Sequence, residues 1–583
     1  MYLCIYIILM CGIWFYTQLL SQSNNKEEIM KACDEIKKRG PDRTIHKYLT
    51  FGKFEFHLAF HRLAIMDLSE AGDQPFVMEQ NDEQIYLMCN GEIYGYQNLV
   101  KEFQLENKLK SHSDCEILIH LYEKLGIKGL YEILTTRNDV SGEFAIIVIH
   151  IKNDKCEIHY IRDFCGKRPL YYSEYEHSID YDGFQTEFNA LCLTSQLCGI
   201  PFPEYYYKKS GQVKASTYGT YIIYKDLESI LKLNEYTENL RNIPITIFDE
   251  NEACEKIYNV FMKIVEDQMV SDREVAFMLS GGLDSSLCAG AGAYVLKQKK
   301  LTKQTNKIKT ICIGLEGGTD EKFAKMVADY IGSDHMHILC TEEEFIDCAE
   351  NRITHKIESY DITSNRASVP QLISAEKIEN NTDCKVIVVG DYADEVCGGY
   401  NETKYAPTID DYKERIYELT EDIIYFDGER VDRCVGGSGL EARMPFGDHR
   451  FIKLYMSIDP ALRKARDGCE KYLLRKAFDG KGIIPDEVLW RPKEAFSDGV
   501  SSLKRSWYQI VLDYFDNKYT DEDLEKAKLL YKINTPYTKE SLHYRMKFNE
   551  KYSNIQANVV PYFWLPKWGN VKEPSARVLS VYK

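Results

Sequence analysis

The chain has 583 residues and a formal net charge of −17. This length exceeds what one hydrophobic core supports, so roughly two to four domains are expected. The negative charge disfavours a polyanionic partner, which argues against nucleic acid as a substrate. Eighteen cysteines occur without a C-x-x-C pair, which fits free thiols in a reducing compartment, so a cytoplasmic protein is expected. His335 and His337 lack a clustered third ligand and do not predict zinc.

The first twenty residues form an apolar run of about the length of a membrane span or a secretory signal. Nothing basic precedes this run, and the first lysine is Lys26, which is atypical of either segment. A membrane segment is therefore not expected. The run also contains Met10, Cys11, Gly12 and Ile13, a short motif that matters below.

Up to about residue 205 the chain alternates short β-rich runs at 54–68, 84–96, 143–151 and 156–173 with one amphipathic helical stretch at 114–126. The stretch 236–252 is polar and loosely patterned and predicts a linker, which we place at 206–251. A helical pattern then covers 251–270, and buried strands are expected at 275–279, 308–315 and 385–390 with helical segments between them. This alternation predicts a parallel α/β sheet.

The most informative stretch is the loop Ser280-Gly281-Gly282-Leu283-Asp284-Ser285-Ser286, between a predicted strand and a predicted helix. Its glycines let backbone N–H groups approach an anion, its serines add hydroxyl donors, and the helix N-terminus favours negative charge. The loop therefore predicts a phosphate site. Asp284 beside phosphates makes sense as a ligand of Mg²⁺. The alternative is a plain glycine turn.

S-G-G-x-D-S at a strand-to-helix junction resembles the pyrophosphate-binding loop of the ATP pyrophosphatases, which adenylate an oxygen and release pyrophosphate. Ahead of it, "KKRGPDR", "HRLAIMDLSEAGDQPF", "CNGEIYGY" and "SDCEILIHLYEKLG" resemble a class II glutamine amidotransferase domain. After it, "GDYADEVCGGY", "GLEARMPFGDHRFI", "EKYLLRKAF" and "LWRPKEAFSDGV" resemble blocks of the glutamine-hydrolysing asparagine synthetases.

This resemblance implies an α+β N-terminal-nucleophile sandwich with α-β-β-α layers, followed by an α/β parallel-sheet ATP-pyrophosphatase domain. It implies an extension at 1–9 that is absent from the mature protein, an amidotransferase domain at 10–205, a linker at 206–251, a synthetase domain at 252–545 and a tail at 546–583.

The implied reaction makes asparagine from aspartate, with glutamine as ammonia donor and ATP as co-substrate with Mg²⁺. Ammonia would pass through an internal tunnel to β-aspartyl-AMP, and the products would be asparagine, glutamate, AMP and pyrophosphate. The expected partners are these small molecules, without nucleic acid or membrane. The oligomeric state is left open, with a homodimer as one candidate.

The nucleophile of the family is a cysteine at the mature N-terminus, whose free α-amine accepts the thiol proton near neutral pH. Cys11 matches it, but nine residues precede Met10-Cys11. We favour an interpretation in which Met10 is the true start or the leader is removed. Two alternatives stay open: residues 1–20 are a signal or anchor, or the extension is kept and the enzyme uses ammonia alone.

Five residues match the glutamine site of the family. Asn90 and Gly91 match the oxyanion hole, although an Asn-Gly pair taken alone is more typical of a hairpin turn. Arg62 matches the arginine that grips the α-carboxylate of glutamine. Glu92 and Asp114 match acidic groups at its amine, although each taken alone is typical of a solvated surface charge.

The second half matches the family's nucleotide site. The ATP-binding residues implied are Leu279, Ser280, Gly281, Gly282, Asp284, Ser285, Ser286, Ile313, Val389 and Gly390, with Leu279 and Ile313 flanking adenine. Asp284 and Asp394 match Mg²⁺-linked carboxylates. Lys493 matches a lysine that stabilises charge during adenylation or ammonia attack, and Asp391 a carboxylate at the acyl-adenylate step.

The stretch around Asp391 departs from the family pattern. Val389 replaces a serine, Asp391 a glutamate and Tyr392 a glycine. A bulky Tyr392 would narrow the aspartate pocket, which keeps open a relative that amidates another acid or closes a β-lactam. A degenerate protein that only senses ATP or glutamine is a further alternative, disfavoured because Cys11, Asp284 and Lys493 are retained.

Overall fold

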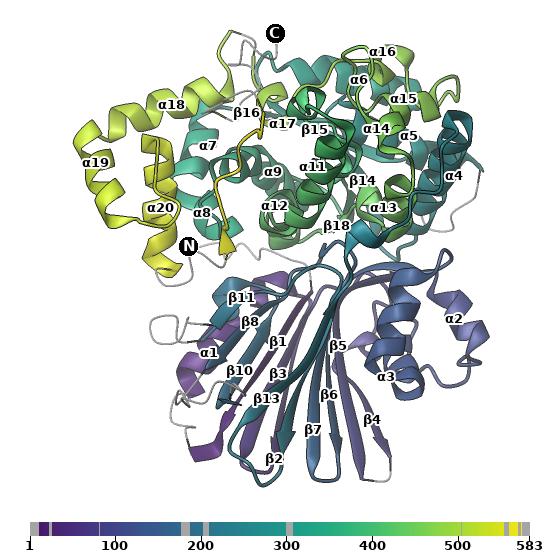
Figure 1. Cartoon of the computed structure of the whole chain (residues 1–583), viewed down its shortest axis with the longest axis vertical. Coiled ribbons are helices and arrows are strands. Elements are labelled where there is room, and N and C mark those ends of the chain that lie inside the picture. Colours follow the sequence, from purple (N-terminus) through teal and green to yellow (C-terminus); the bar gives the residue numbers. More distant parts are fainter. Residues whose placement is uncertain are drawn as a thin grey trace. The chain divides into compact units, whose positions relative to one another are not determined.

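The computed structural model describes residues 11–21, 26–80, 82–175, 187–201, 209–298, 307–502, 504–552, 559–568 and 573 (Figure 1). Residues 1–10 lie outside the described residues, and with them the expectations about an N-terminal extension. None of the described helices is long and apolar enough to cross a membrane. The chain divides into two compact units: residues 1–238, 436–440 and 551–559 form the first, and the remaining residues form the second.

The first unit contains two antiparallel sheets. The six-stranded sheet has the order β11-β8-β10-β1-β3-β2, and the seven-stranded sheet has the order β4-β5-β6-β7-β12-β13-β9. Its strands are β1 Gly12–Leu19, β2 Arg43–Phe51, β3 Phe54–Arg62, β4 Phe76–Gln80, β5 Glu83–Tyr94, β6 Ser141–Lys152, β7 Lys155–Arg162, β8 Tyr171–Tyr175, β9 Glu187–Phe188, β10 Ala190–Thr194, β11 Lys209–Gln212, β12 Thr217–Tyr224 and β13 Ile230–Thr237. Its helices are α1 Lys26–Glu35, α2 Tyr96–Glu102 and α3 Ile117–Thr136.

Three hydrophobic cores hold this unit together. The largest lies between the two sheets and joins residues of β1 and β3 to residues of β6 and β7. A second core packs α2 and α3 on the other face of β5 and β6, and a third packs α1 on the other face of β1 and β3. Two sheets face to face with helices on their outer faces therefore make up the first unit (Figure 1).

Strand β1 explains the apolar N-terminal run from residue 12 onward. Ile13 and Phe15 point into the core between the sheets, while Trp14 and Tyr16 point into the core under α1. Because successive side chains of a strand point to opposite faces, a strand buried on both faces reads as a continuous apolar run. All eight residues of β1, Gly12–Leu19, are buried.

The predicted linker at 206–251 is wrong over most of its length. Strand β12 pairs with β7 and β13, and Tyr221 and Ile223 enter the core between the sheets. Beyond Ile230, the residues of β13 are partly or fully exposed, so the segment has the polar composition of a linker although it pairs with β12 in the sheet. The first unit therefore extends to residue 238 rather than 205.

The second unit is built on a five-stranded parallel sheet of order β16-β15-β14-β17-β18. The strands are β14 Glu274–Met278, β15 Lys309–Leu315, β16 Asp334–Cys340, β17 Cys384–Val388 and β18 Glu441–Arg443. The helices are α4 Glu250–Gln268, α5 Leu283–Gln298, α6 Thr319–Ile331, α7 Glu342–Asp347, α8 Ile353–Ile357, α9 Ile362–Asn381, α10 Ala393–Cys397, α11 Ile409–Asp422, α12 Asp427–Cys434, α13 His449–Met456, α14 Pro460–Arg463, α15 Tyr472–Phe478, α16 Asp486–Leu489, α17 Phe496–Gly499, α18 Trp507–Lys518, α19 Asp521–Leu530 and α20 Lys539–Tyr552.

The order of the parallel strands places the site. The chain adds β15 and β16 on one side of β14, then crosses to add β17 and β18 on the other side. The loops after β14 and β17 therefore diverge at a topological switch point, where open α/β sheets bind their ligands at the carboxyl ends of the strands. The sequence-predicted phosphate loop follows β14, and Asp391 follows β17.

Candidate active sites

Cys11 lies directly before β1, against the end of β3. Its Sγ is 3.3 Å from both the carbonyl oxygen and the backbone nitrogen of Leu63, and Arg39 Nε donates to the Cys11 carbonyl at 3.0 Å. Gly12 pairs with His61, so Arg62 lies in the neighbouring strand beside the thiol. The predicted nucleophile and the predicted carboxylate-binding arginine are therefore adjacent.

Asn90 is fully buried in the middle of β5, and its side chain is poorly satisfied. Its Nδ2 donates to Ser195 Oγ at 3.5 Å, and its Oδ1 has no hydrogen-bond partner among the described residues. Ser195 Oγ also accepts from the Ile13 backbone N–H at 3.0 Å, which ties Asn90 to the strand that follows Cys11. A buried amide with one long hydrogen bond is expected to meet a polar ligand.

Gly91 follows Asn90 inside β5, so the pair does not form a hairpin turn. Its φ is +145°, and a Cβ here would lie 1.7 Å from the carbonyl oxygen of Glu143 on β6. Only glycine fits this close approach of two backbones. The strand is thus held in the conformation that presents the Gly91 region beside Asn90.

The charged residues predicted to bind glutamine are all buried. Arg62 donates to the Ser69 carbonyl at 2.5 Å and to Asp73 Oδ1 at 2.7 Å, and Asp114 Oδ2 accepts the Ile93 N–H at 2.5 Å. Glu92, next to Gly91, is 6% exposed. These carboxylates are therefore not solvated surface charges, and Asp114 fixes the end of the strand that carries Asn90.

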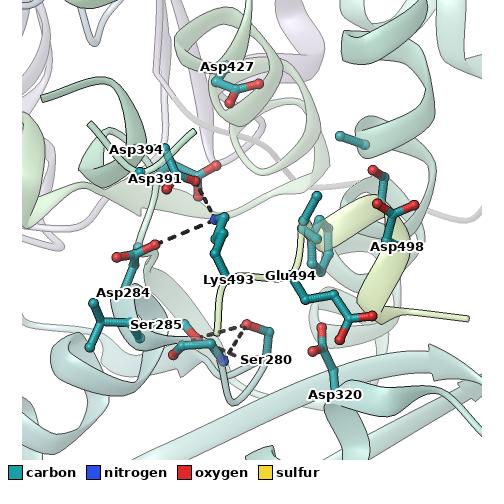
Figure 2. A pocket seen from close by; sticks show the side chains of 18 of the residues that line it. Ser280, Asp284, Ser285, Asp320, Asp391, Asp394, Asp427, Lys493, Glu494 and Asp498 are labelled. Carbon is teal, nitrogen blue, oxygen red and sulfur yellow. Dashed lines mark hydrogen bonds and ion pairs between the residues drawn. The ribbon is translucent and has the colours of Figure 1, made fainter. Parts of the chain in front are cut away.

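A cavity of about 240 Å³ in the second unit opens where the loops after β14 and β17 diverge (Figure 2). Eight of the ten residues predicted to bind ATP line it, together with Asp391, Asp394 and Lys493. Leu279 and Ile313 are buried at its wall, as expected for residues flanking a base. Gly281 and Ser286 are not among the lining residues.

The loop after β14 is held by its own serines. Ser285 Oγ accepts the backbone N–H of Ser280 at 3.1 Å and lies 3.0 Å from Ser280 Oγ (Figure 2). Gly281 has a φ of +72°, and a Cβ there would lie 2.4 Å from the backbone nitrogen of Ala324. Gly390 approaches Ser285 so closely that its Cβ would lie 2.6 Å from the Ser285 nitrogen. Glycine is therefore required on both loops of the switch point.

Two lysines lie between the carboxylates of the cavity. Lys471 Nζ is 2.5 Å from both Asp284 Oδ2 and Asp394 Oδ1, and Lys493 Nζ is 2.5 Å from Asp394 Oδ2 and 3.9 Å from Asp284 Oδ2. Burial disfavours ionisation of Asp394, but the charges of Lys471 and Lys493 outweigh it and lower the Asp394 pKa. The same carboxylates overcome burial and raise the pKa of Lys493, so both signs of charge persist at neutral pH.

A second charged group begins at Asp391. Arg430 donates to Asp391 Oδ1 at 2.7 Å, to Asp427 Oδ1 at 3.1 Å and to Gln371 Oε1 at 2.9 Å. Burial raises the pKa of Asp391 although the Arg430 charge opposes the shift. The guanidinium thus ties the loop after β17 to the start of α12.

Tyr392 adopts the conformation that explains why glycine is usual at this position. Its φ is +76°, in the left-handed region, and its side chain is buried at the cavity wall. A Cβ on Gly428 would lie 2.6 Å from Tyr392 Oη, so Gly428 leaves the room that the ring occupies. The expected narrowing of the cavity is thus partly relieved by a second glycine.

Two family models match the chain. One, described as a glutamine amidotransferase domain, matches residues 10–207, and the other, described as asparagine synthase, matches 256–422 and 408–554. A probable glutamine-hydrolysing asparagine synthetase of Acanthamoeba polyphaga mimivirus is 35% identical over 98% of this chain and 100% of that protein. The glutamine-hydrolysing asparagine synthetases of Cricetulus griseus and Homo sapiens are 35% and 34% identical over 98% of this chain and 99% of theirs. The chain belongs to this family.

The sequence motifs did not identify all of the charged residues at the cavity. Lys471 lies in the motif "EKYLLRKAF", but the motif predicted no role for it, and Arg430 lies in none of the motifs. Ser195 and Arg39, which hold the backbone around Cys11, were also missed. The signal that would have found Lys471 is its place at the start of a motif shared with the family.

Two places were tested as metal sites. Asp284 Oδ1 is buried at the cavity without a hydrogen-bond partner among the described residues, and a hard carboxylate oxygen beside a phosphate loop suits Mg²⁺. The ligand atoms of His150, Glu157 and His159 lie within 4.8 Å of one another. The His150 nitrogens are, however, 2.8 Å from Tyr122 Oη and 2.5 Å from Glu83 Oε1, so we assign no metal there.

Cys11 is half-buried, whereas most of the other described cysteines are buried. Burial raises the pKa of Cys192 and Cys288 well above the ordinary value and that of Cys434 to about 12. These thiols therefore stay protonated and pack as small apolar groups.

Proposed function

We propose that this chain makes asparagine from aspartate, takes the amide nitrogen from glutamine, and cleaves ATP to AMP and pyrophosphate. The observation that carries the proposal is the pair Lys471 and Lys493, held between the phosphate-loop carboxylate Asp284 and Asp394. This arrangement supports adenylation rather than simple nucleotide binding, because buried cations at the phosphates stabilise charge that develops during transfer.

In the first unit the Cys11 thiol attacks the amide carbon of glutamine. The C–N bond breaks, the thiol proton goes to the leaving nitrogen, and ammonia departs from a thioester that water then hydrolyses to glutamate. Asn90 Nδ2 and the Gly91 N–H stabilise the oxyanion, Arg62 binds the α-carboxylate, and Glu92 and Asp114 bind the amine. The poorly satisfied Asn90 amide supports this assignment, because a substrate oxygen supplies the partner it lacks.

The Cys11 mechanism requires a free α-amine to accept the thiol proton. We infer that mature Cys11 is N-terminal, supported by the amidotransferase match that begins at residue 10. If the preceding residues are kept, the chain works as an ammonia-dependent synthetase.

In the second unit the β-carboxylate of aspartate attacks the α-phosphorus of ATP, and the bond to pyrophosphate breaks. Ammonia then attacks the activated carbonyl, the bond to AMP breaks, and a proton is lost. Leu279, Ile313, Val389 and Gly390 hold the base and sugar. Ser280, Gly281, Gly282, Ser285 and Ser286 hold the phosphates. Asp391 orients the acyl-adenylate, and Lys493 donates to the oxygens that gain charge.

Asp284 and Asp394 would hold Mg²⁺, which supplies positive charge to the phosphates when bound. Within the protein, Asp284 and Asp394 also fix the ammonium groups of Lys471 and Lys493, so the cations are placed before the phosphates arrive.

We also propose the specific fold of each unit. The helix-sheet-sheet-helix packing of the first unit supports the N-terminal-nucleophile sandwich, and the switch-point loop supports the ATP-pyrophosphatase assignment. Free buried thiols support a cytoplasmic location. A homodimer remains a proposal that light scattering tests.

The deciding experiment supplies amide-¹⁵N glutamine, aspartate and ATP, and follows label into asparagine together with AMP and pyrophosphate. ADP as the nucleotide product, or unlabelled asparagine from a chain with a verified free Cys11 amine, would contradict the proposal.

Tyr392 favours one second candidate: adenylation of an acid other than aspartate. Its ring lies at the cavity wall where the family usually has glycine. A panel of carboxylic acids assayed for pyrophosphate release ranks the acceptors, and aspartate is expected to rank first.

A further inference from the structure

The C-terminal segment, which carries no recognisable motif, forms part of the wall of the cavity in the second unit. Residues 560–568 are described as an irregular segment, and Trp564 and Pro566 line the cavity beside Tyr400 and Glu402. All of these residues belong to the second unit. We call residues 560–567 the C-terminal strap.

Hydrogen bonds and ion pairs fasten the strap along its length. The Trp564 backbone N–H donates to Asp361 Oδ1 at 2.9 Å, and Tyr562 Oη donates to Asp422 Oδ2 at 2.5 Å. Lys567 Nζ lies 2.8 Å from Glu418 Oε1. Asp361 caps the start of α9, Glu418 lies within α11, and Asp422 lies at the end of α11. The strap is therefore fixed to the body of the second unit.

Trp564 also touches a chain of groups that leads to the predicted catalytic carboxylate. Its ring centre is 5.0 Å from that of Tyr400, at an interplanar angle of 48°. Tyr400 Oη lies 2.5 Å from Glu395 Oε1 and 3.1 Å from Asp427 Oδ2. Asp427 then accepts from Arg430, which donates to Asp391.

The strap meets the cavity near Asp427, because Trp564 packs on Tyr400, whose Oη is 3.1 Å from Asp427 Oδ2. Figure 2 shows Ser280 and Ser285 at one end of the cavity, Asp427 at the other, and Lys493 between them. On that side the guanidinium of Arg430 pairs with Asp391 and Asp427. Glu395 is instead 2.5 Å from Tyr400 Oη. The placement of this acidic group relative to Arg430 depends on Tyr400, and Tyr400 is packed by Trp564.

We propose that Trp564 is a positioning residue for the acceptor acid and that the strap excludes water from the acyl-adenylate. This rests on the proposed function, because it assigns the Asp391–Arg430 side of the cavity to the acceptor. An acyl-adenylate reached by water returns to the free acid with loss of AMP, so each leak consumes ATP without forming an amide. An indole over Tyr400 closes that side with apolar surface.

The test uses the full chain with Trp564→Ala, Trp564→Phe and Trp568→Ala. Trp568 follows the strap, stacks under Lys567 and does not line the cavity, so it is the matched control. Three quantities are measured: KM for aspartate, KM for ATP, and pyrophosphate released per asparagine formed.

For Trp564→Ala we expect the KM for aspartate to rise about tenfold, the upper range for loss of an aromatic pair. The KM for ATP stays within about twofold of the parent value, because the phosphate side is intact. The ratio of pyrophosphate to asparagine rises above one. Trp564→Phe restores much of both properties, and Trp568→Ala matches the parent chain.

A parent-like aspartate KM and product ratio in Trp564→Ala would overturn the proposal. Absence of aspartate-dependent pyrophosphate release from the parent chain would instead overturn the proposed function. Should Trp564→Ala fail to fold, Tyr400→Phe decides, because it removes only the hydroxyl that bonds Glu395 and Asp427. A parent-like aspartate KM in that variant also counts against the proposal.

Discussion

The two units assemble their sites by opposite means. In the first unit, Cys11, Leu63, Asn90 and Ser195 come from different antiparallel strands or their ends, and Ser195 accepts from Ile13 across 182 residues of sequence. In the second unit, most of the phosphate site lies in one loop after β14. The loop after β14 keeps its geometry through its own hydrogen bonds. The proposed glutamine site forms only when the strands of each sheet have paired in register and the two sheets have packed together.

The chemistry differs in the same way. In the proposed function, the first unit depends on the single nucleophile Cys11. The second unit would divide the stabilisation of charge among Lys471, Lys493, Asp284 and Asp394, which pair with one another. Substitution of Cys11 is therefore expected to abolish glutamine-dependent synthesis, whereas single substitutions in the cavity of the second unit are expected to lower pyrophosphate release by degrees.

The largest expected effect is that of Cys11→Ala. We expect glutamine-dependent asparagine synthesis to fall by about 10⁴-fold, the scale on which loss of a nucleophile acts. Synthesis from ammonium salts persists, because the second unit is untouched. Labelled glutamine and labelled ammonium assayed in parallel measure both. Cys198→Ala, a half-buried cysteine in the same unit, is the control, and equal loss with both nitrogen sources would break the comparison.

Next is Lys493→Met, which keeps the side-chain volume and removes the charge. We expect pyrophosphate release to fall by about 10²–10³-fold, as for loss of one preorganised donor. Glutaminase activity, measured as glutamate release, stays at the parent value. Lys481→Met, at an exposed position, is the control. A drop of less than about threefold would argue that Lys493 only pairs Asp394.

A smaller effect is expected at the contact between Tyr392 and Gly428. Gly428→Ala places a Cβ 2.6 Å from Tyr392 Oη, and overpacking of this kind costs about 1–3 kcal/mol of folding free energy. In a Tyr392→Gly background the new Cβ still lies 2.9 Å from the Ile423 carbonyl oxygen but no longer meets the ring, so the same change costs less. Denaturant unfolding of the two single variants and the double variant gives the coupling energy. Equal costs in both backgrounds would mean that the ring and Gly428 do not interact.

The fourth prediction concerns the pH dependence of stability and Asp320, whose pKa is raised from 3.8 to about 7, chiefly by burial, while Arg491 at 3.2 Å opposes the shift. As pH rises from about 4 to about 7, the unfolded chain loses this proton before the folded chain does. The free energy of unfolding therefore falls, by at most about 1.4 kcal/mol per pH unit, and is level above pH 7.

Asp320→Asn should flatten that fall in the free energy of unfolding, measured by urea unfolding across the window. Asp329→Asn is the matched control, because Asp329 is an exposed residue of the same helix α6. A variant with the parent slope would show that other groups cause the pH dependence.

Local patterns predicted the second unit better than the first. The strand, loop and helix around residues 275–298 could be read directly, because glycines and serines in that loop satisfy one another within a few residues. Lys471 could not be placed beside Asp284, because 187 residues separate them and only tertiary packing brings them together. The roles of Arg430 and the C-terminal strap could not be predicted for the same reason, because their partners are distant in the sequence.

The helix expected at 114–126 is confirmed from Ile117 to Gly126, where a φ of +66° interrupts the helical backbone. The second helical stretch, which continues α3 to Thr136, was not predicted. Strand β13 of the expected linker was missed because most of it is exposed on both faces, so no alternation of apolar and polar residues marks it.

One further consequence comes from the buried thiols. Alkylating and oxidising agents react with thiolates that solvent can reach, and burial denies Cys192, Cys288 and Cys434 both properties. Cys11 keeps its access, so an electrophile added at neutral pH is expected to label it ahead of them. Burial thus restricts thiol chemistry to the few described cysteines that solvent reaches, which are Cys11, Cys198, Cys254 and Cys469.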